Sequence, residues 1–190
     1  MKRTLAVVCL FVCVTIAQAQ NATKAAAASP AASTAPTKDP VATAARLILQ
    51  RFQTNTIGAI EAMPADKFTY KPTADQITFG HLAAHIASSN NLFCSKSADV
   101  PAPKVDEPKE TDSKDQLVAA VKASFAFCSD ALGKMDDSKL GDTVELFPGR
   151  QLPRSVAVLA IASSMADHYA AAAMYLRLNN ILPPSAQPKK

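Results

Sequence analysis

The chain of 190 residues contains no tryptophan, only five glycines and only three histidines. So few glycines leave no glycine-rich loop of the kind that cradles phosphate. The serine-hydrolase pattern G-x-S-x-G, the redox pair C-x-x-C and the zinc motif H-E-x-x-H are all absent from the sequence. With these signatures excluded, the three histidines are the main candidates for chemistry.

An excess of charge of one sign is also missing. The formal net charge is +4, and leaving out Lys2 and Arg3 lowers it by two, to about +2. Basic residues are scattered, and aromatic residues make up only 6% of the chain. Because a nucleic-acid surface needs a basic stripe, we expect no nucleic-acid partner.

The first residues predict an export signal. Lys2 and Arg3 precede an apolar run over residues 5–16 that is too short to span a bilayer. Ala17-Gln18-Ala19 then fits the small-x-small rule for signal-peptide cleavage. We therefore predict a signal peptide over residues 1–19, and the alternative is an uncleaved membrane anchor.

The rest of the chain divides into a linker and one domain. Residues 20–38 are rich in Ala, Thr, Ser and Pro and are predicted to be a flexible linker. Residues 39–185 have the length of one ordinary domain. We judge no segment after the signal long and apolar enough to cross a membrane, so we expect a periplasmic or secreted protein without membrane contact after cleavage.

Two of the four cysteines remain after cleavage. Cys9 and Cys13 leave with the signal peptide, whereas Cys94 and Cys128 stay. An even number of cysteines in an oxidising compartment favours a disulfide. Two buried free thiols, or one reactive thiol near a functional site, are the alternatives.

Start and stop signals predict four amphipathic helices and no convincing strand. Prolines and a 3.6-residue apolar period indicate each helix. Asp39 and Thr78 are the predicted N-caps of the first and second helices, and Ser113 with Gln116 has the form of a capping box at the start of the third. Residues 142–151 are predicted to be a short loop or hairpin in which Phe147, beside Pro148-Gly149, serves loop packing, with a place at the mouth of a pocket as the alternative. This pattern predicts an all-α four-helix bundle, since an α-solenoid would need an internal repeat that the sequence lacks. The predicted helices run from Pro40 to Met63, from Thr78 to about Lys96, from Ser113 to Gly133 and from Pro153 to Asn179. The predicted core positions of the fourth helix are Val158, Ile161, Met165, His168, Ala172 and Tyr175.

The histidines are spaced so that they can meet. His81 and His85 are four residues apart and share one face of the second predicted helix, and His168 falls on a predicted core position of the fourth. Three imidazoles that converge from two packed helices make a three-histidine metal site. The alternatives are a capping role at the helix start for His81, and buried, hydrogen-bonded core positions for His85 and His168.

Three stretches of the domain resemble the DinB-like family of four-helix bundles. They are residues 63–73 (MPADKFTYKPT), residues 79–87 (FGHLAAHIA), and residues 167–169 (DHY) followed by 175–184 (YLRLNNILPP). The chain is most similar to the exported branch of the family, in which Cys94 and Cys128 have similar counterparts. The resemblance implies an up-down-down-up order of helices, frequent homodimers, and a divalent metal ion, commonly zinc or nickel, held by three histidines.

The resemblance maps only two of these three ligands onto histidine. One ligand maps to His85 and another to His168, but the remaining position is Ser164 in this chain. A hydroxyl is a poorer ligand than an imidazole, so we expect His81 to complete a trio with His85 and His168. Ser164 then either holds a water in a relic site or packs between helices, and Asp167 is a candidate to orient an imidazole.

The resemblance leaves two functions open. The first is a metal-dependent enzyme, either a hydrolase that activates water or an S-transferase or isomerase that activates a small thiol. For an exported protein, hydrolysis is the better fit, because thiol-dependent enzymes need small thiols and these are abundant in the cytoplasm. The second is a non-catalytic bundle with a degenerate metal site that binds a small ligand or a partner protein.

Overall fold

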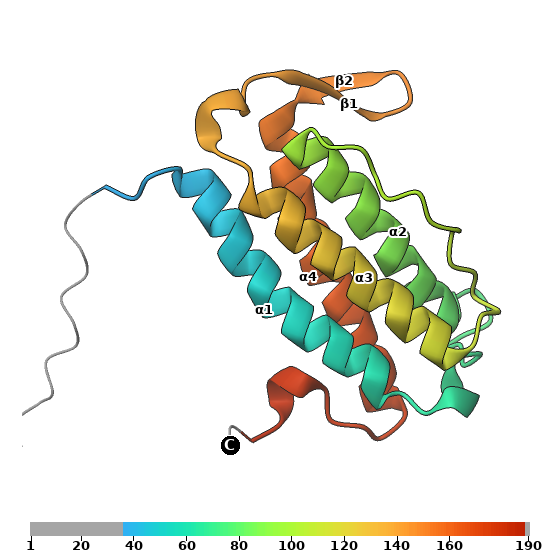
Figure 1. Cartoon of the computed structure of the whole chain (residues 1–190). Coiled ribbons are helices and arrows are strands. Elements are labelled where there is room, and N and C mark those ends of the chain that lie inside the picture. The colour runs from blue at the N-terminus through green and yellow to red at the C-terminus, as the bar shows by residue number, and fades with distance from the viewer. Residues whose placement is uncertain (1–35, 189–190) are drawn as a thin grey trace, which may run out of the picture. The chain divides into compact units, whose positions relative to one another are not determined.

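The computed structural model describes residues 36–188 (Figure 1). The predicted signal peptide over residues 1–19 lies outside the described residues, as does residue range 20–35 of the predicted linker. Both assignments therefore stay predictions.

Four long helices form the bundle shown in Figure 1. They are α1 (Pro40–Ala62), α2 (Phe79–Ala98), α3 (Lys114–Gly133) and α4 (Arg154–Leu178). α2 packs on both α3 and α4, and α1 packs on the same two helices. The short 3-10 turns η1 (Ala65–Lys67), η2 (Asp137–Lys139) and η3 (Pro184–Ala186) lie in the connections and the C-terminal segment. The four predicted helices are thus all present, and their ends lie within two residues of the predicted ones.

A small β-hairpin, one of the two forms predicted for residues 142–151, makes the fold mostly helical and so corrects the all-α expectation. Strands β1 (Thr143–Phe147) and β2 (Arg150–Pro153) pair antiparallel, with a register shift between Glu145 and Phe147. The turn between them needs Gly149, because its φ of 73° lies in the left-handed region that favours glycine. The hairpin extends over one end of the bundle, where α4 begins (Figure 1).

Two of the predicted helix caps are confirmed. The Thr78 hydroxyl accepts a hydrogen bond from the backbone N–H of His81 at 2.9 Å and so begins α2. Ser113 and Gln116 form a complete capping box at the start of α3.

The expected cap of α1 by Asp39 is wrong. Asp39 adopts a left-handed conformation with φ of 49°, and its side chain accepts no hydrogen bond from α1 but one from the backbone N–H of Asp137, at 3.3 Å. Instead the Asp137 carboxylate accepts hydrogen bonds from the N–H groups of Val41 and Ala42, at 2.9 and 2.8 Å. At the other end of α1, the Lys114 ammonium donates to the carbonyls of Glu61 and Met63, both at 2.8 Å. Residues far along the chain therefore complete both ends of the first helix.

The buried side of α4 forms much of the core. All six of its predicted core residues are buried: Val158, Ile161, Met165, His168, Ala172 and Tyr175. Contrary to our expectation from the sequence, α4 is long and apolar enough to cross a membrane by length and composition alone. A core helix of a soluble bundle passes the same test, and the buried residues of α4 pack against α1 and α2.

Residues 99–113, which we call the strap, connect α2 to α3 (Figure 1). The Thr78 hydroxyl donates to the Glu110 carboxylate at 3.0 Å, which ties the strap to the start of α2. A Cβ atom at Gly80 would lie only 2.7 Å from the Glu110 carbonyl oxygen. Glycine at position 80 therefore allows the strap to approach the helix backbone.

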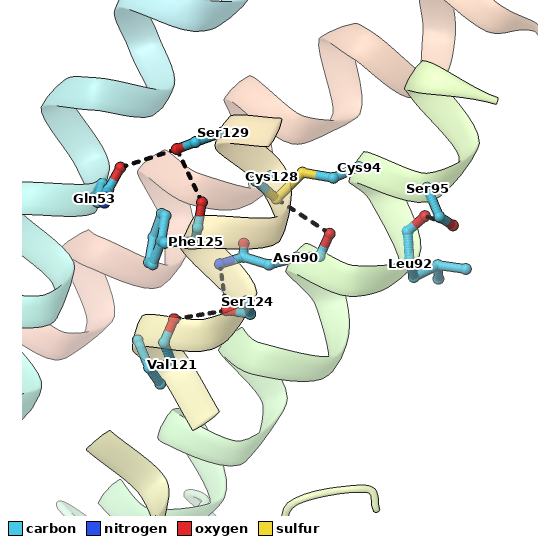
Figure 2. The surroundings of a disulfide bond; sticks show 10 residues. All are labelled: Gln53, Asn90, Leu92, Cys94, Ser95, Val121, Ser124, Phe125, Cys128 and Ser129. Carbon is cyan, nitrogen blue, oxygen red and sulfur yellow. Dashed lines mark hydrogen bonds between the residues drawn. A yellow bond between two sulfur atoms is a disulfide. The ribbon is translucent and has the colours of Figure 1, made fainter. Parts of the chain in front are cut away.

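A disulfide between Cys94 and Cys128 links α2 to α3 (Figure 2). Both cysteines are fully buried, and their Cα atoms are 5.2 Å apart. One turn earlier on each helix, the Asn90 amide donates to the Ser124 hydroxyl at 3.1 Å. The two helices are therefore joined by a covalent bond and, beside it, by a buried hydrogen bond.

We predict that the disulfide stabilises the fold substantially. It closes a loop with a sequence separation of 34 residues, which the chain-entropy model converts to about 4 kcal/mol. Reduction of the protein should lower its free energy of unfolding by that order, measured by urea denaturation with and without reductant. The Cys94→Ser/Cys128→Ser double variant should show the same loss and no response to reductant. Two titratable thiols in the denatured, non-reduced protein would contradict the disulfide.

Candidate functional site

A cavity of about 550 Å³ lies between α2, α4 and the hairpin, and we call it the trough. Its polar residues are His85 and Ser89 of α2 together with Ser163, Ser164, Asp167 and His168 of α4. Its apolar residues are Leu92, Phe93, Phe147 and Ala160. The trough therefore has two ends of different chemistry, which are described in turn.

Two histidines meet at the polar end. The ring centroids of His85 and His168 are 4.9 Å apart, and the rings are close to perpendicular. The Ser89 hydroxyl lies 3.3 Å from Nε2 of His85, and the Ser164 hydroxyl lies 3.4 Å from Nδ1 of His168. Each imidazole thus has a serine one helical turn away on its own helix, and the tautomer decides which group donates.

The two rings differ in exposure. His168 is only 7% exposed, as expected for a core position. His85 is exposed, because the buried face of α2 passes through its neighbours Leu82 and Ile86 and leaves position 85 at the edge of the trough. The alternative interpretation of His85 as a buried core histidine is therefore wrong, and its ring reaches His168 from the edge of the trough.

Burial keeps His168 uncharged near neutral pH. The pKa of His168 is lowered from 6.5 to about 4, first by desolvation and second by the neighbouring His85. The Asp167 carboxylate acts in the opposite direction and raises the pKa of His168. The imidazole is therefore a neutral hydrogen-bonding group over most of the physiological pH range.

The third histidine lies elsewhere. The ring of His81 is half-exposed, and its Nδ1 lies 3.4 Å from a carboxylate oxygen of Glu110 on the strap. It lines a smaller hollow of about 250 Å³, which His85 and Glu107 also line. The structure thus brings His85 and His168 together and places His81 against the strap.

The donors in the trough do not make a complete metal site. Within residues 36–188, no group of three or more His, Cys, Asp and Glu side chains converges to hold a metal ion. The polar end offers two imidazoles, the hydroxyls of Ser89 and Ser164, and the Asp167 carboxylate, which does not converge with the two imidazoles on one point. Catalytic zinc sites normally have three converging nitrogen, sulfur or carboxylate ligands, so the residues present fall one ligand short of the set that the resemblance implies.

Two aromatic rings form the apolar end. Phe93 of α2 and Phe147 of the hairpin meet edge-to-face, with centroids 6.1 Å apart. The Arg150 guanidinium lies 6.0 Å from the centroid of the Phe147 ring. Phe147 thus lies in the wall of the trough, as the alternative interpretation of this residue has it, and not in loop packing alone.

A buried arginine holds the hairpin over the trough. Arg154 is 5% exposed, and its guanidinium lies 3.2 Å from the Asp99 carboxylate and 3.7 Å from that of Asp142. It also donates to the Lys139 carbonyl at 3.2 Å. Because these groups belong to the end of α2, the base of the hairpin and η2, Arg154 fixes the hairpin relative to the helices.

The fold is that of a mostly helical bundle with a cavity between its helices. Comparison of the sequence with known families identifies the family to which the chain belongs. The model of the DinB superfamily matches residues 48–172. The chain therefore belongs to the DinB superfamily. No curated protein matches it.

Solved structures share the fold. A DinB-like protein from Bacillus cereus ATCC 10987 has a TM-score of 0.59 and 17% identity, over 72% of this chain and 93% of that chain. The DinB-like protein YjoA from Bacillus subtilis has a TM-score of 0.58 and 18% identity, over 75% of this chain and 99% of that chain. The mycothiol-dependent maleylpyruvate isomerase has a TM-score of 0.56 and 16% identity, over 68% of this chain and 59% of that chain.

We predict that His168 makes the stability of the metal-free protein depend on pH. Its folded pKa of about 4 lies below its ordinary value of 6.5, so the unfolded state binds more protons between these values. The contribution of neutral His168 is therefore complete above pH 6.5 and is lost as the pH falls towards 4. In chelator, the His168→Gln variant should lose less stability than the wild type over this window in urea denaturation. An NMR titration that gave His168 an ordinary pKa would contradict this prediction.

Proposed function

We propose that the protein is an exported DinB-superfamily bundle that binds a small molecule in the trough without catalysing a reaction. The observation that carries the proposal is the trough itself, which places a buried, neutral His168 and its partner His85 at one end of a cavity of about 550 Å³. This volume lies within the range of small-molecule sites, which are mainly apolar with a few polar groups that orient the ligand. Ser164 supports the non-catalytic reading, because it leaves the family's metal ligands incomplete.

A metal-dependent enzyme is the second candidate, either a hydrolase or an S-transferase-like enzyme with zinc or nickel. The contact between His85 and His168 favours it, because imidazole must be deprotonated to bind a metal ion and His168 is held in that form. A structural neighbour is a mycothiol-dependent isomerase, which would bring thiol chemistry into this candidate. His85 and His168 would hold the ion, and a third ligand would have to come from His81 or from outside the chain.

The proposal includes three further features. Export rests on residues 1–19, and N-terminal sequencing of the exported protein would test the cleavage site. Two hydrogen bonds support the up-down-down-up order of the helices. The bond between Thr78 and Glu110 joins the start of α2 to the segment just before α3. The bond from Lys114 to the Met63 carbonyl joins the start of α3 to the end of α1. A homodimer is supported by the outer face of α4, which carries exposed apolar side chains: Val156, Leu159, Met174 and Leu178.

We predict that restoring the missing ligand restores metal binding. Position 164 is one turn from His168 and lines the trough, so Ser164→His should tighten zinc binding at least about tenfold over the wild type, measured by competition with a zinc dye. Ala166→His is the matched control, because position 166 is exposed on α4 and does not line the trough. Stoichiometric zinc or nickel in the purified wild type, lost in both His85→Ala and His168→Ala, would instead establish the second candidate.

We predict that small-molecule fragments bind in the trough of the metal-free protein. They should shift the NMR signals of His85 and His168, and Ala160→Phe should abolish the shifts because it fills the apolar end. Ala170→Phe is the control, since position 170 is exposed on α4 and does not line the trough. Fragments that bind Ala160→Phe as well as the wild type would contradict the proposed site.

A further inference from the structure

The two ends of the trough differ in charge as well as in polarity, and this difference identifies a ligand class. Asp167 supplies the only carboxylate among the residues that line the trough in the described part of the chain, and no lysine or arginine is among them. The Asp167 carboxylate acts on the ring of His168, whose pKa it raises against the effect of burial. The polar end therefore favours a positive charge on a ligand over a negative one.

The opposite end favours an aromatic group. Phe93 and Phe147 meet edge-to-face there, with Leu92 and Ala160 completing the apolar wall. Phe147 is 38% exposed, so part of its ring is free to be covered. Aromatic rings pack well against such a pair, in offset or edge-to-face arrangements.

The spacing of the two ends sets the length of the ligand. Asp167 and Ala160, which line opposite ends, are seven residues apart on α4, which corresponds to about 10 Å along a helix. The Asp167 side chain and one hydrogen bond occupy part of this distance. A ring and an amine joined by a short chain of about four methylene groups fill the rest.

From these observations, we propose that the trough binds an aryl-alkyl amine, with the aromatic ring against Phe93 and Phe147 and the ammonium group beside Asp167. This inference rests on the proposed function, because it names the ligand class of the same site. The hydroxyls of Ser89 and Ser164 and the unprotonated ring nitrogens of the two histidines are then the acceptors available to the N–H groups of the ammonium. No covalent step is involved.

The experiment compares three probes that share a phenylbutyl group: 4-phenylbutylamine, 4-phenylbutanol and 5-phenylvalerate. Calorimetric titration uses the disulfide-bonded protein of residues 20–190 at pH 7 in chelator and low salt. We expect the amine to bind about fivefold more tightly than the alcohol, because an exposed ion pair contributes up to about that factor, and the acid to bind most weakly. The advantage of the amine should shrink as salt screens the charges.

Variants separate the two ends. Asp167→Asn should bring the affinity for the amine down to that for the alcohol and leave the alcohol unchanged, whereas Phe147→Ala should weaken binding of all three probes. Asp130→Asn is the control, because Asp130 is exposed on α3 and does not line the trough. It should change nothing.

The outcomes distinguish this inference from the proposed function. Equal affinity for the amine and the alcohol, or preference for the acid, would overturn the amine assignment. So would an advantage of the amine that survives in Asp167→Asn. If none of the three probes binds, the amine assignment also fails, while fragments that bind the wild type but not Ala160→Phe would still support a small-molecule site.

Discussion

The ion pairs of Arg154 are the interaction on which the shape of the site depends. A guanidinium that is 5% exposed has to be neutralised and hydrogen-bonded, because an unpaired buried charge is strongly destabilising. Its partners Asp99 and Asp142 and the Lys139 carbonyl come from three separate segments. The contacts that neutralise Arg154 therefore fix the hairpin against α2 and α4. They also fix the position of Phe147 in the wall of the trough.

The disulfide and the histidine pair lie on opposite sides of α2, so one side of this helix is structural and the other faces the trough. Cys94 and Asn90 attach the helix to α3, on the side away from the trough. His85 and Phe93 face α4 and the hairpin. The rigid attachment on one side lets the other side present its functional groups at fixed positions, as a binding site on a regular element requires.

Helices and their local boundaries were predictable from the sequence, because they depend on neighbours in the chain. The Thr78 cap and the Ser113–Gln116 capping box are examples that the structure confirms. Features that depend on distant residues were not predictable in this way. The N–H of Val41 in α1 is capped by Asp137, which lies 96 residues further along the chain. The sequence around Asp39 does not indicate that a residue other than Asp39 caps this helix.

The site was predictable only in part, for the same reason. Helical spacing and a family resemblance identified His85 and His168, which do meet. The exposure of His85 depends on how α2 is rotated against its neighbours, and a residue three or four positions away from a buried one is not necessarily buried itself. The role of Phe147 depends on where the hairpin lies, which the remote ion pairs of Arg154 decide.

The capping of α1 also has a consequence for the order in which the chain can fold. The amide groups at its start are satisfied by Asp137 and the carbonyls at its end by Lys114. A ribosome makes the chain from the N-terminus, so α1 is complete in sequence long before either partner exists. Its ends must then be solvated by water until residue 137 has emerged. The native contacts at the two ends of α1 can therefore form only after residues 114 and 137 have been synthesised.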